Sequence, residues 1–171
     1  MEYPVTATSS HSSFQNFLRH ILAPLPLPLL QPILNRIICG AAADRPELFN
    51  RLGLHQHKTY LIDPINMPFV FILKPHAVQP QLKAYRRQRL HPDHDARISG
   101  TFLTLMNMVD GQLDGDALFF TRDLVVEGDT EAVVVLRNAL DDLDGSIIDD
   151  LADQFGAVGR AVTFTLRRIR I

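Results

Sequence analysis

Apolar residues recur at helical spacing in two segments near the start of the chain. In residues 14–22 and again in residues 29–39 they fall three or four positions apart, which predicts two amphipathic helices. The proline-rich segment 24–28 between them predicts an extended hinge, because each proline fixes its own φ and disfavours helix at the preceding residue. We expect Pro32 in the first turn of the second helix and Gly40 near its end.

A third helix is predicted to begin after Asp44. Asp44 and Glu47 have the spacing of a capping box, and Pro46 suits the first turn of a helix. Gly53 is expected just past the end of this helix, where a positive φ is common. The residues predicted to face inward are Leu48, Phe49 and Leu52.

Short apolar runs then predict strands. Residues 58–63 and 69–73 are separated by a turn segment with a proline at each end, and together they predict a β-hairpin. The basic segment 83–89 is predicted to lie in a connection rich in proline and histidine. Residues 96–99 are predicted to return the chain to the sheet.

Helix and strand alternate in the second half of the chain. Residues 102–109 have helical spacing, and residues 119–126 predict one or two strands. Asp129 follows a glycine and is placed to cap the next helix. Residues 130–140 have a run of valines that favours a strand but a leucine spacing that favours a helix, and we predict a helix. Residues 146–171 predict a helix, with a strand at the extreme end as the alternative.

The composition indicates one domain with an additional arm. A chain of 171 residues with 46% apolar residues can bury one sizeable core. Its 17 basic and 19 acidic residues nearly balance, so nothing favours nucleic acid as a partner. The single cysteine, Cys39, excludes an internal disulfide, and we expect a reducing, cytoplasmic location.

No motif for catalysis is present. The sequence lacks a G-x-S-x-G elbow and the glycine-rich loops that bind phosphate, so we expect no enzyme activity and no cofactor. His55 and His57 are expected to share one face of a strand, and residues 91–95 contain further potential ligands. Without a cysteine pair or an H-E-x-x-H helix we predict no metal site. A small hydrolase or transferase that uses the histidines is the weakest alternative.

One stretch of the chain carries a family resemblance. Residues 114–144 contain L-F-F-T-R-D-L-V-V-E-G-D-T-E and then V-L-R-N-A-L-D-D-L-D, and this stretch resembles the signature of the sterol-carrier-protein-2 (SCP2) family. Residues of about 45–143 match that family's domain in layout. The resemblance implies an α+β fold, in which a mixed, mainly antiparallel sheet is covered by helices around an apolar lipid tunnel. It also implies a flexible tail and amphipathic helical arm in residues 1–43, and a lipid-binding domain in residues 44–171.

The same resemblance implies a function. Within the family the chain is similar to bacterial accessory factors of oxygen-independent ubiquinone biosynthesis, which implies a non-enzymatic carrier of isoprenoid quinone precursors, fatty acyl chains or phospholipid. Its expected partners are the hydroxylation proteins of that pathway and the surface of the inner membrane, to which it would bind peripherally. A scaffold with a filled core, whose acidic face docks partner enzymes, is the alternative.

Two sets of residues are predicted to contact such a lipid. The expected lining of the tunnel is Ile33, Ile37, Phe71, Phe102, Leu105, Met106, Phe119, Phe120 and Val126. The basic segment supplies Arg86, Arg87 and Arg89 for head groups, since each basic residue gains about 1 kcal/mol near an anionic membrane. A solvated basic loop is the alternative for these arginines, and which face of each strand points inward is left open.

Overall fold

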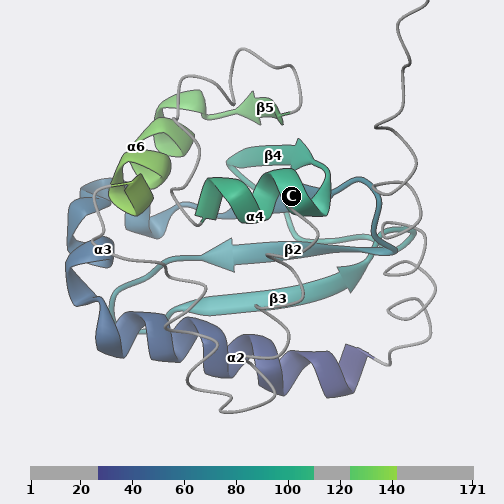
Figure 1. Ribbon diagram of the computed structural model, residues 1–171, viewed down its shortest axis with the longest axis horizontal. Helices are drawn as coiled ribbons and strands as arrows, with labels where there is room; N and C mark the ends of the chain where they lie inside the picture. Colours follow the sequence, from purple (N-terminus) through teal and green to yellow (C-terminus); the bar gives the residue numbers. More distant parts are fainter. Residues whose placement is uncertain (1–26, 110–123, 142–171) are drawn as a thin grey trace, which may run out of the picture.

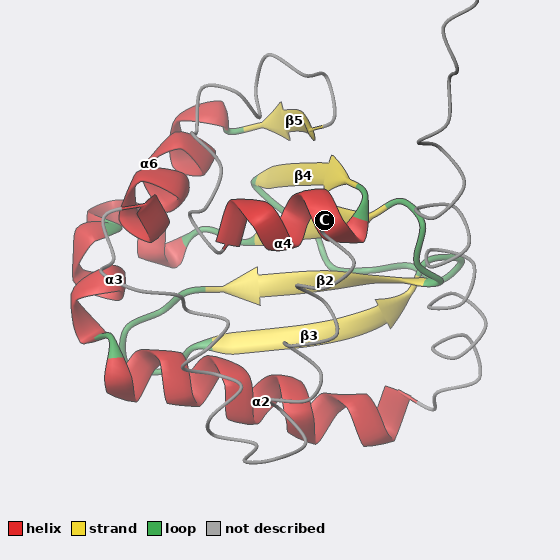
Figure 2. Cartoon of the chain, viewed as in Figure 1, coloured by secondary structure: helices red, strands yellow, loops and turns green. Residues whose placement is uncertain are grey.

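The computed structural model describes residues 27–109 and 124–141 of the 171-residue chain. The helices, drawn in red in Figure 2, are α2 (Leu27–Asp44), α3 (Pro46–Arg51), the 3-10 helix η1 (Gly53–His57), α4 (Phe102–Val109) and α6 (Thr130–Asp141). The strands are β1 (Tyr60–Pro64), β2 (Phe69–Lys74), β3 (Gln81–Arg86), β4 (Ala96–Gly100) and β5 (Leu124–Gly128). The predictions for residues 14–22, Phe119, Phe120 and residues 146–171 lie outside the described residues.

The five strands form one mixed sheet in the order β3-β2-β1-β4-β5. Strand β1 pairs with β4 in parallel, and the other three pairings are antiparallel. Figure 1 shows α4 lying across the sheet, with α6 and α3 beyond one end of the strands and α2 alongside β3. The predicted α+β fold with a mixed, mainly antiparallel sheet is therefore confirmed.

The two faces of the sheet have different surroundings. Successive residues of a strand point to opposite faces, so the pairing register assigns each side chain to one of them. Tyr60 of β1 and Ile98 of β4 share one buried cluster with Leu105 of α4 and Leu136 of α6, and we call this side the helix face. A second cluster of Leu61, Val70 and Ile72 packs against Tyr85 on the other side, which we call the open face.

Helix α2 seals the edge of β3. The Gln31 side-chain amide donates a hydrogen bond to the Leu82 carbonyl at 2.8 Å and accepts one from the Ala84 amide at 3.3 Å. These two backbone groups belong to the outermost strand, whose free edge would otherwise be open to another chain. One amide side chain thus supplies the two bonds that a further strand would make.

The boundaries predicted for α2 were wrong. The helix begins at Leu27 and continues to Asp44, so Pro32 lies in its second turn and Gly40 lies inside it. Pro32 lacks one backbone donor, but burial of Leu34 and Ile38 against the rest of the fold stabilises the helix.

The capping box predicted before α3 was also wrong. Asp44 ends α2, and the residue that precedes α3 is Arg45, which makes no side-chain capping bond. Pro46 does begin the helix, and Gly53 follows its end with a φ of +53°. The predicted inward residues Leu48, Phe49 and Leu52 are all buried.

Two further predictions in the first half of the chain were wrong. Residues 83–89 were expected in a connection, but most of them belong to β3, where Leu82 and Ala84 face the helices and Lys83 faces the open side. His55 and His57 were expected on a strand, but they lie in η1, because the chain continues in a tight helical turn after Gly53.

Several other predicted elements are confirmed. The hairpin of β1 and β2 is present, and β4 and α4 occupy residues 96–100 and 102–109. Residues 130–141 form α6, so the leucine spacing outweighed the preference of valine for strands. Asp129 caps this helix, since its carboxylate accepts the Ala132 amide at 3.0 Å.

Candidate functional site

Several predicted lipid-lining residues lie on the helix face. Phe71 of β2 pairs with Ile62, and Val126 of β5 pairs with Ile98, which places both on the side covered by α4. Leu105 of α4 is buried in the same cluster that Val126 packs against. The pairing register therefore brings members from β2, β5 and α4 to one face of the sheet.

The burial of these side chains is incomplete. Leu105 is only 5% exposed, but Phe71, Phe102, Met106 and Val126 are each only partly buried. Phe71 lies edge-on to Phe69, with their ring centroids 5.7 Å apart. Large apolar side chains thus retain accessible surface beside the helices.

Helix α2 presents its two predicted residues differently. Ile37 is partly buried, whereas Ile33 is 43% exposed and its neighbour Leu29 is 64% exposed. The inner side of this helix is formed by Leu34 and Ile38, which are buried. Ile33 therefore does not join the residues beneath α4.

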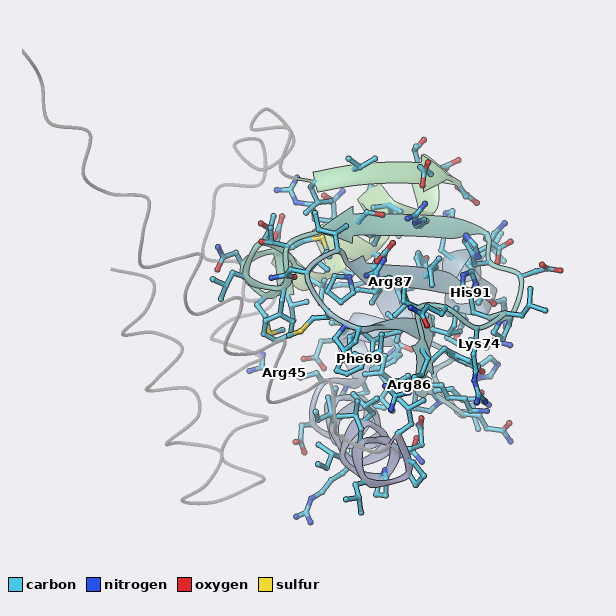
Figure 3. All side chains as sticks on the ribbon, turned by 90° about the vertical axis from the view of Figure 1, so that its right-hand side faces the viewer. Arg45, Phe69, Lys74, Arg86, Arg87 and His91 are labelled. Atoms are coloured by element: carbon cyan, nitrogen blue, oxygen red, sulfur yellow. The ribbon has the colours of Figure 1, made fainter. Side chains whose placement is uncertain are left out.

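The three arginines predicted to meet head groups do not share a face. Arg86 pairs with Phe69 and lies at the helix side of β3, and Arg89 is exposed in the turn that follows. Arg87 lies on the open face, where Figure 3 shows it on the same side as His91. The Arg87 guanidinium donates to the Met67 carbonyl at 3.1 Å and to the Pro64 carbonyl at 2.7 Å.

A buried carboxylate on the open face joins two arginines. Asp63 is 2% exposed, and its oxygens lie 2.5 Å from Arg87 Nη2 and 2.6 Å from Arg97 Nη2. Arg97 also donates to Glu127 at 2.8 Å. Burial opposes ionisation of Asp63, but the hydrogen bonds and positive charges of both arginines outweigh it and hold the pKa of this carboxyl below its usual value.

These charges border a cavity of about 390 Å³ on the open face. Its lining consists of Leu61, Asp63, Val70, Arg87, His91, His94, Asp95, Arg97, Glu127 and Gly128. We did not predict this site from the sequence. The available signal was a charged residue within an apolar strand, namely Asp63 after Leu61 and Ile62, and Arg97 between Ala96 and Ile98.

A second group of polar contacts joins β1, β4 and α6. The Asp95 carboxylate accepts the Thr59 amide at 2.7 Å, and Lys58 Nζ lies 3.4 Å from Asp95 and 3.1 Å from Asp129. The pKa of Asp129 is lowered chiefly by the hydrogen bond from the Ala132 amide and next by the hydrogen bond from Lys58. Gly128 has a φ of +81°, and a Cβ atom there would collide with the Asp95 carbonyl oxygen.

The hydroxyl group of Tyr60 lies buried close to these polar contacts. Its ring is fully buried, and the hydroxyl oxygen lies 3.2 Å from the His55 carbonyl and 3.3 Å from the Ala132 carbonyl. Burial, together with the negative charges of Asp129 and Asp95, raises the pKa of Tyr60 to about 12. The neutral phenol can donate its one hydrogen to either carbonyl and so links β1 to η1 or α6.

The described residues contain no group of three or more His, Cys, Asp or Glu side chains placed to hold a metal ion. No helix in residues 27–109 and 124–141 has the length and apolar character needed to cross a membrane.

Comparison with known proteins identifies a family. The model of the SCP-2 sterol transfer family matches residues 36–141, more than half of the chain. No curated protein matches the chain. Among solved structures, the chain is similar to the "UbiJ-SCP2 Ubiquinone synthesis protein", with 17% identity and a TM-score of 0.44 over 82% of this chain and 94% of that one.

Two other solved structures match more weakly in coverage. Sterol Carrier Protein 2 from Yarrowia lipolytica, in its apo form, has 11% identity and a TM-score of 0.44 over 65% of this chain and 86% of that one. The stereoselective inverting sec-alkylsulfatase Pisa1 from Pseudomonas sp. has 16% identity and a TM-score of 0.45 over 56% of this chain and 14% of that one.

Proposed function

Because the chain belongs to the SCP-2 sterol transfer family and carries its lipid-binding domain, we propose that it is a non-enzymatic carrier of isoprenoid quinone precursors. A fatty acyl chain or a phospholipid is the other form of cargo that the same apolar surface suits. The cargo would be held between the helix face of the sheet and the helices that cover it.

One observation carries this proposal. Phe71, Phe102, Met106 and Val126 come from β2, α4 and β5, yet all remain only partly buried beside the helices. Burying each apolar Å² is worth about 25 cal/mol, or about 0.8 kcal/mol for each CH₂ group of a bound chain. A prenyl or acyl tail that completes their burial would gain free energy from both surfaces.

The exposed side of α2 supports loading from a membrane. Leu29 and Ile33 are large apolar residues that face solvent one helical turn apart. An amphipathic helix with such a side can lie in the boundary between head groups and acyl chains. The helix predicted for residues 14–22 would extend this contact, and Arg86 and Arg89 would meet the head groups.

The pathway is proposed from the similarity of the sequence to bacterial accessory factors of oxygen-independent ubiquinone biosynthesis. In this role the protein is a cytoplasmic one that binds the inner membrane peripherally. It presents the ring of the quinone precursor to proteins that hydroxylate the ring without using dioxygen. Residues 1–43 serve as the membrane-seeking arm, and residues 44–171 hold the cargo.

The direct test is native mass spectrometry of protein purified from its own cells, followed by organic extraction. A co-purifying prenylated ring compound is the expected result, and a phospholipid would change the cargo but not the mode of binding. Protein that carries no lipid in either measurement would favour the scaffold with a filled core.

Two matched variants test the location of the cargo. Met106→Glu places a charge beside the apolar side chains of the helix face, and we expect at least about a tenfold loss in uptake of a fluorescent prenyl probe, equivalent to 1.4 kcal/mol or more. Val134→Glu is the control, because Val134 is 47% exposed on α6. A folded Met106→Glu protein that retains uptake would remove this position from the binding surface.

The role of α2 has a separate test. Replacing both Leu29 and Ile33 with Asn is expected to reduce flotation with anionic vesicles while the circular dichroism spectrum is unchanged. Equal flotation of this double variant and the unchanged protein would exclude α2 from membrane contact.

A further inference from the structure

The cavity on the open face is distinct from the surface proposed to hold lipid. Leu61 and Val70 at its base point to the side opposite Phe71 and Val126, as the alternating register of β1, β2 and β5 requires. Its walls carry two arginines and two histidines. A ligand here would therefore not enter between the sheet and α4.

The buried Asp63 holds the two guanidinium groups together. Its two oxygens contact Arg87 from the end of β3 and Arg97 from β4, so one negative charge positions two positive charges. Two like charges this close favour an additional anion, and guanidinium groups bind carboxylate and phosphate through paired N–H donors. Arg97 Nε is buried and has no hydrogen-bond partner among the described residues.

The ion pair between Glu127 and Arg97 is a contact in which a ligand anion could replace the Glu127 carboxylate. Its side chain is 55% exposed, and it contacts Arg97 Nη1 at 2.8 Å. Exposed ion pairs of this kind contribute little to stability, so exchanging Glu127 for another anion costs little. Asp63, in contrast, is buried between both arginines and stays in place.

The rest of the lining limits the shape of the ligand. Leu61 and Val70 supply an apolar base, and the rings of His91 and His94 stand with their centroids 5.6 Å apart. The Asp95 carboxylate accepts the Thr59 amide at 2.7 Å and lies 3.4 Å from Lys58, whose charge it shares with Asp129. A volume of about 390 Å³ lies near the lower end for small-molecule sites and suits one compact ring or short chain.

We propose that this cavity binds a small organic anion, whose carboxylate or phosphate group meets Arg87 and Arg97 in place of Glu127. The apolar part of the anion rests on Leu61 and Val70. The acid group can belong to a soluble metabolite or to the head group of a lipid, since both offer the same oxygens to the arginines.

The experiment measures binding of phenyl phosphate to the full chain by isothermal titration calorimetry. Glu127→Gln removes the competing carboxylate and is expected to tighten binding about two- to fivefold, in line with the small free energy of an exposed ion pair. Arg97→Gln is expected to weaken binding at least tenfold. Lys83→Gln, an exposed change on the open face of β3 outside the cavity, should alter the affinity less than twofold.

Flotation with vesicles containing phosphatidic acid distinguishes the two sources of the acid group. Loss of flotation on Arg97→Gln identifies a lipid head group, and phenyl phosphate binding without such a loss identifies a soluble anion. The proposal is overturned if neither probe depends on Arg97, or if Glu127→Gln leaves phenyl phosphate binding unchanged or weaker. The Glu127→Gln result holds even if Arg97→Gln fails to fold.

The same titration distinguishes this site from the proposed lipid-binding surface. Met106→Glu should leave phenyl phosphate binding unchanged, because Met106 belongs to α4 on the other side of the sheet. Loss of lipid uptake with intact anion binding would thus be expected if both sites exist.

Discussion

Replacing Tyr60 with Phe removes a single buried hydroxyl group and gives a stability difference that changes with pH. At pH 8 the variant loses the hydrogen bond to the His55 or Ala132 carbonyl, and the expected cost is about 1 kcal/mol. The ring itself stays buried, so no cavity larger than one oxygen atom is created.

The pH dependence follows from the raised pKa. The phenol of Tyr60 ionises near pH 10.0 in the unfolded chain but only at about 12 in the folded protein. The folded state therefore favours the protonated form, and its contribution is fully present below pH 10 and is lost as the pH rises toward 12. By pH 11 the unchanged protein has lost up to about 1.4 kcal/mol through this group, and the Phe variant loses none of it.

Urea denaturation at pH 8, 9, 10 and 11 provides the assay. The stability advantage of the unchanged protein should shrink from about 1 kcal/mol toward zero near pH 11. Tyr85→Phe is the control, because Tyr85 lies partly exposed on the open face. A constant gap between the unchanged protein and Tyr60→Phe across this range would refute the raised pKa of Tyr60.

Three further substitutions test other contacts. Asp63→Asn should lower stability at pH 7 by about 1–3 kcal/mol, a range reduced because both arginine partners are more than a third exposed. Because the pKa of Asp63 is depressed, the difference in stability between the two proteins should narrow as the pH falls below about 4. If both proteins lose the same stability on acidification, this prediction is contradicted. Gly128→Ala should cost about 1–3 kcal/mol in thermal denaturation, since the new Cβ meets a backbone oxygen at a positive φ; an unchanged melting temperature would contradict this. Gln31→Leu should cost about 1 kcal/mol and speed amide hydrogen exchange along the outer edge of β3, and unaltered exchange would exclude the proposed seal.

Strands β1, β2 and β4, which lie in the interior of the sheet, could be predicted because turn residues bound their apolar runs. Strand β3 was missed because its edge position allows Gln81 and Lys83 to alternate with Leu82 and Ala84, and Arg86 ends the strand, so its composition resembles a solvated connection. The length of α2 was missed because a proline at the sixth position suggests a helix start, and the packing that offsets it involves residues distant in sequence.

The candidate sites were predictable to different degrees. The residues of the helix face could be named from their spacing, but not their orientation, because both faces of β1 and β2 carry apolar side chains. The anion cavity depends on Asp63 meeting Arg97, 34 residues later in the chain, and this contact is created only by the parallel pairing of β1 with β4. The capping box failed for a related reason, since Asp44 is used to finish the preceding helix.

The parallel pairing of β1 with β4 has a consequence for how the protein folds. The meander of β1, β2 and β3 is local in sequence, whereas Thr59 and Asp95 must meet across 36 residues of chain. Closing so large a loop costs entropy before any contact compensates for it, so we expect this seam to form late and to limit the folding rate. Until this seam closes, the β1 edge of the meander would lack a partner strand, and a chain in that state would be the form most prone to self-association.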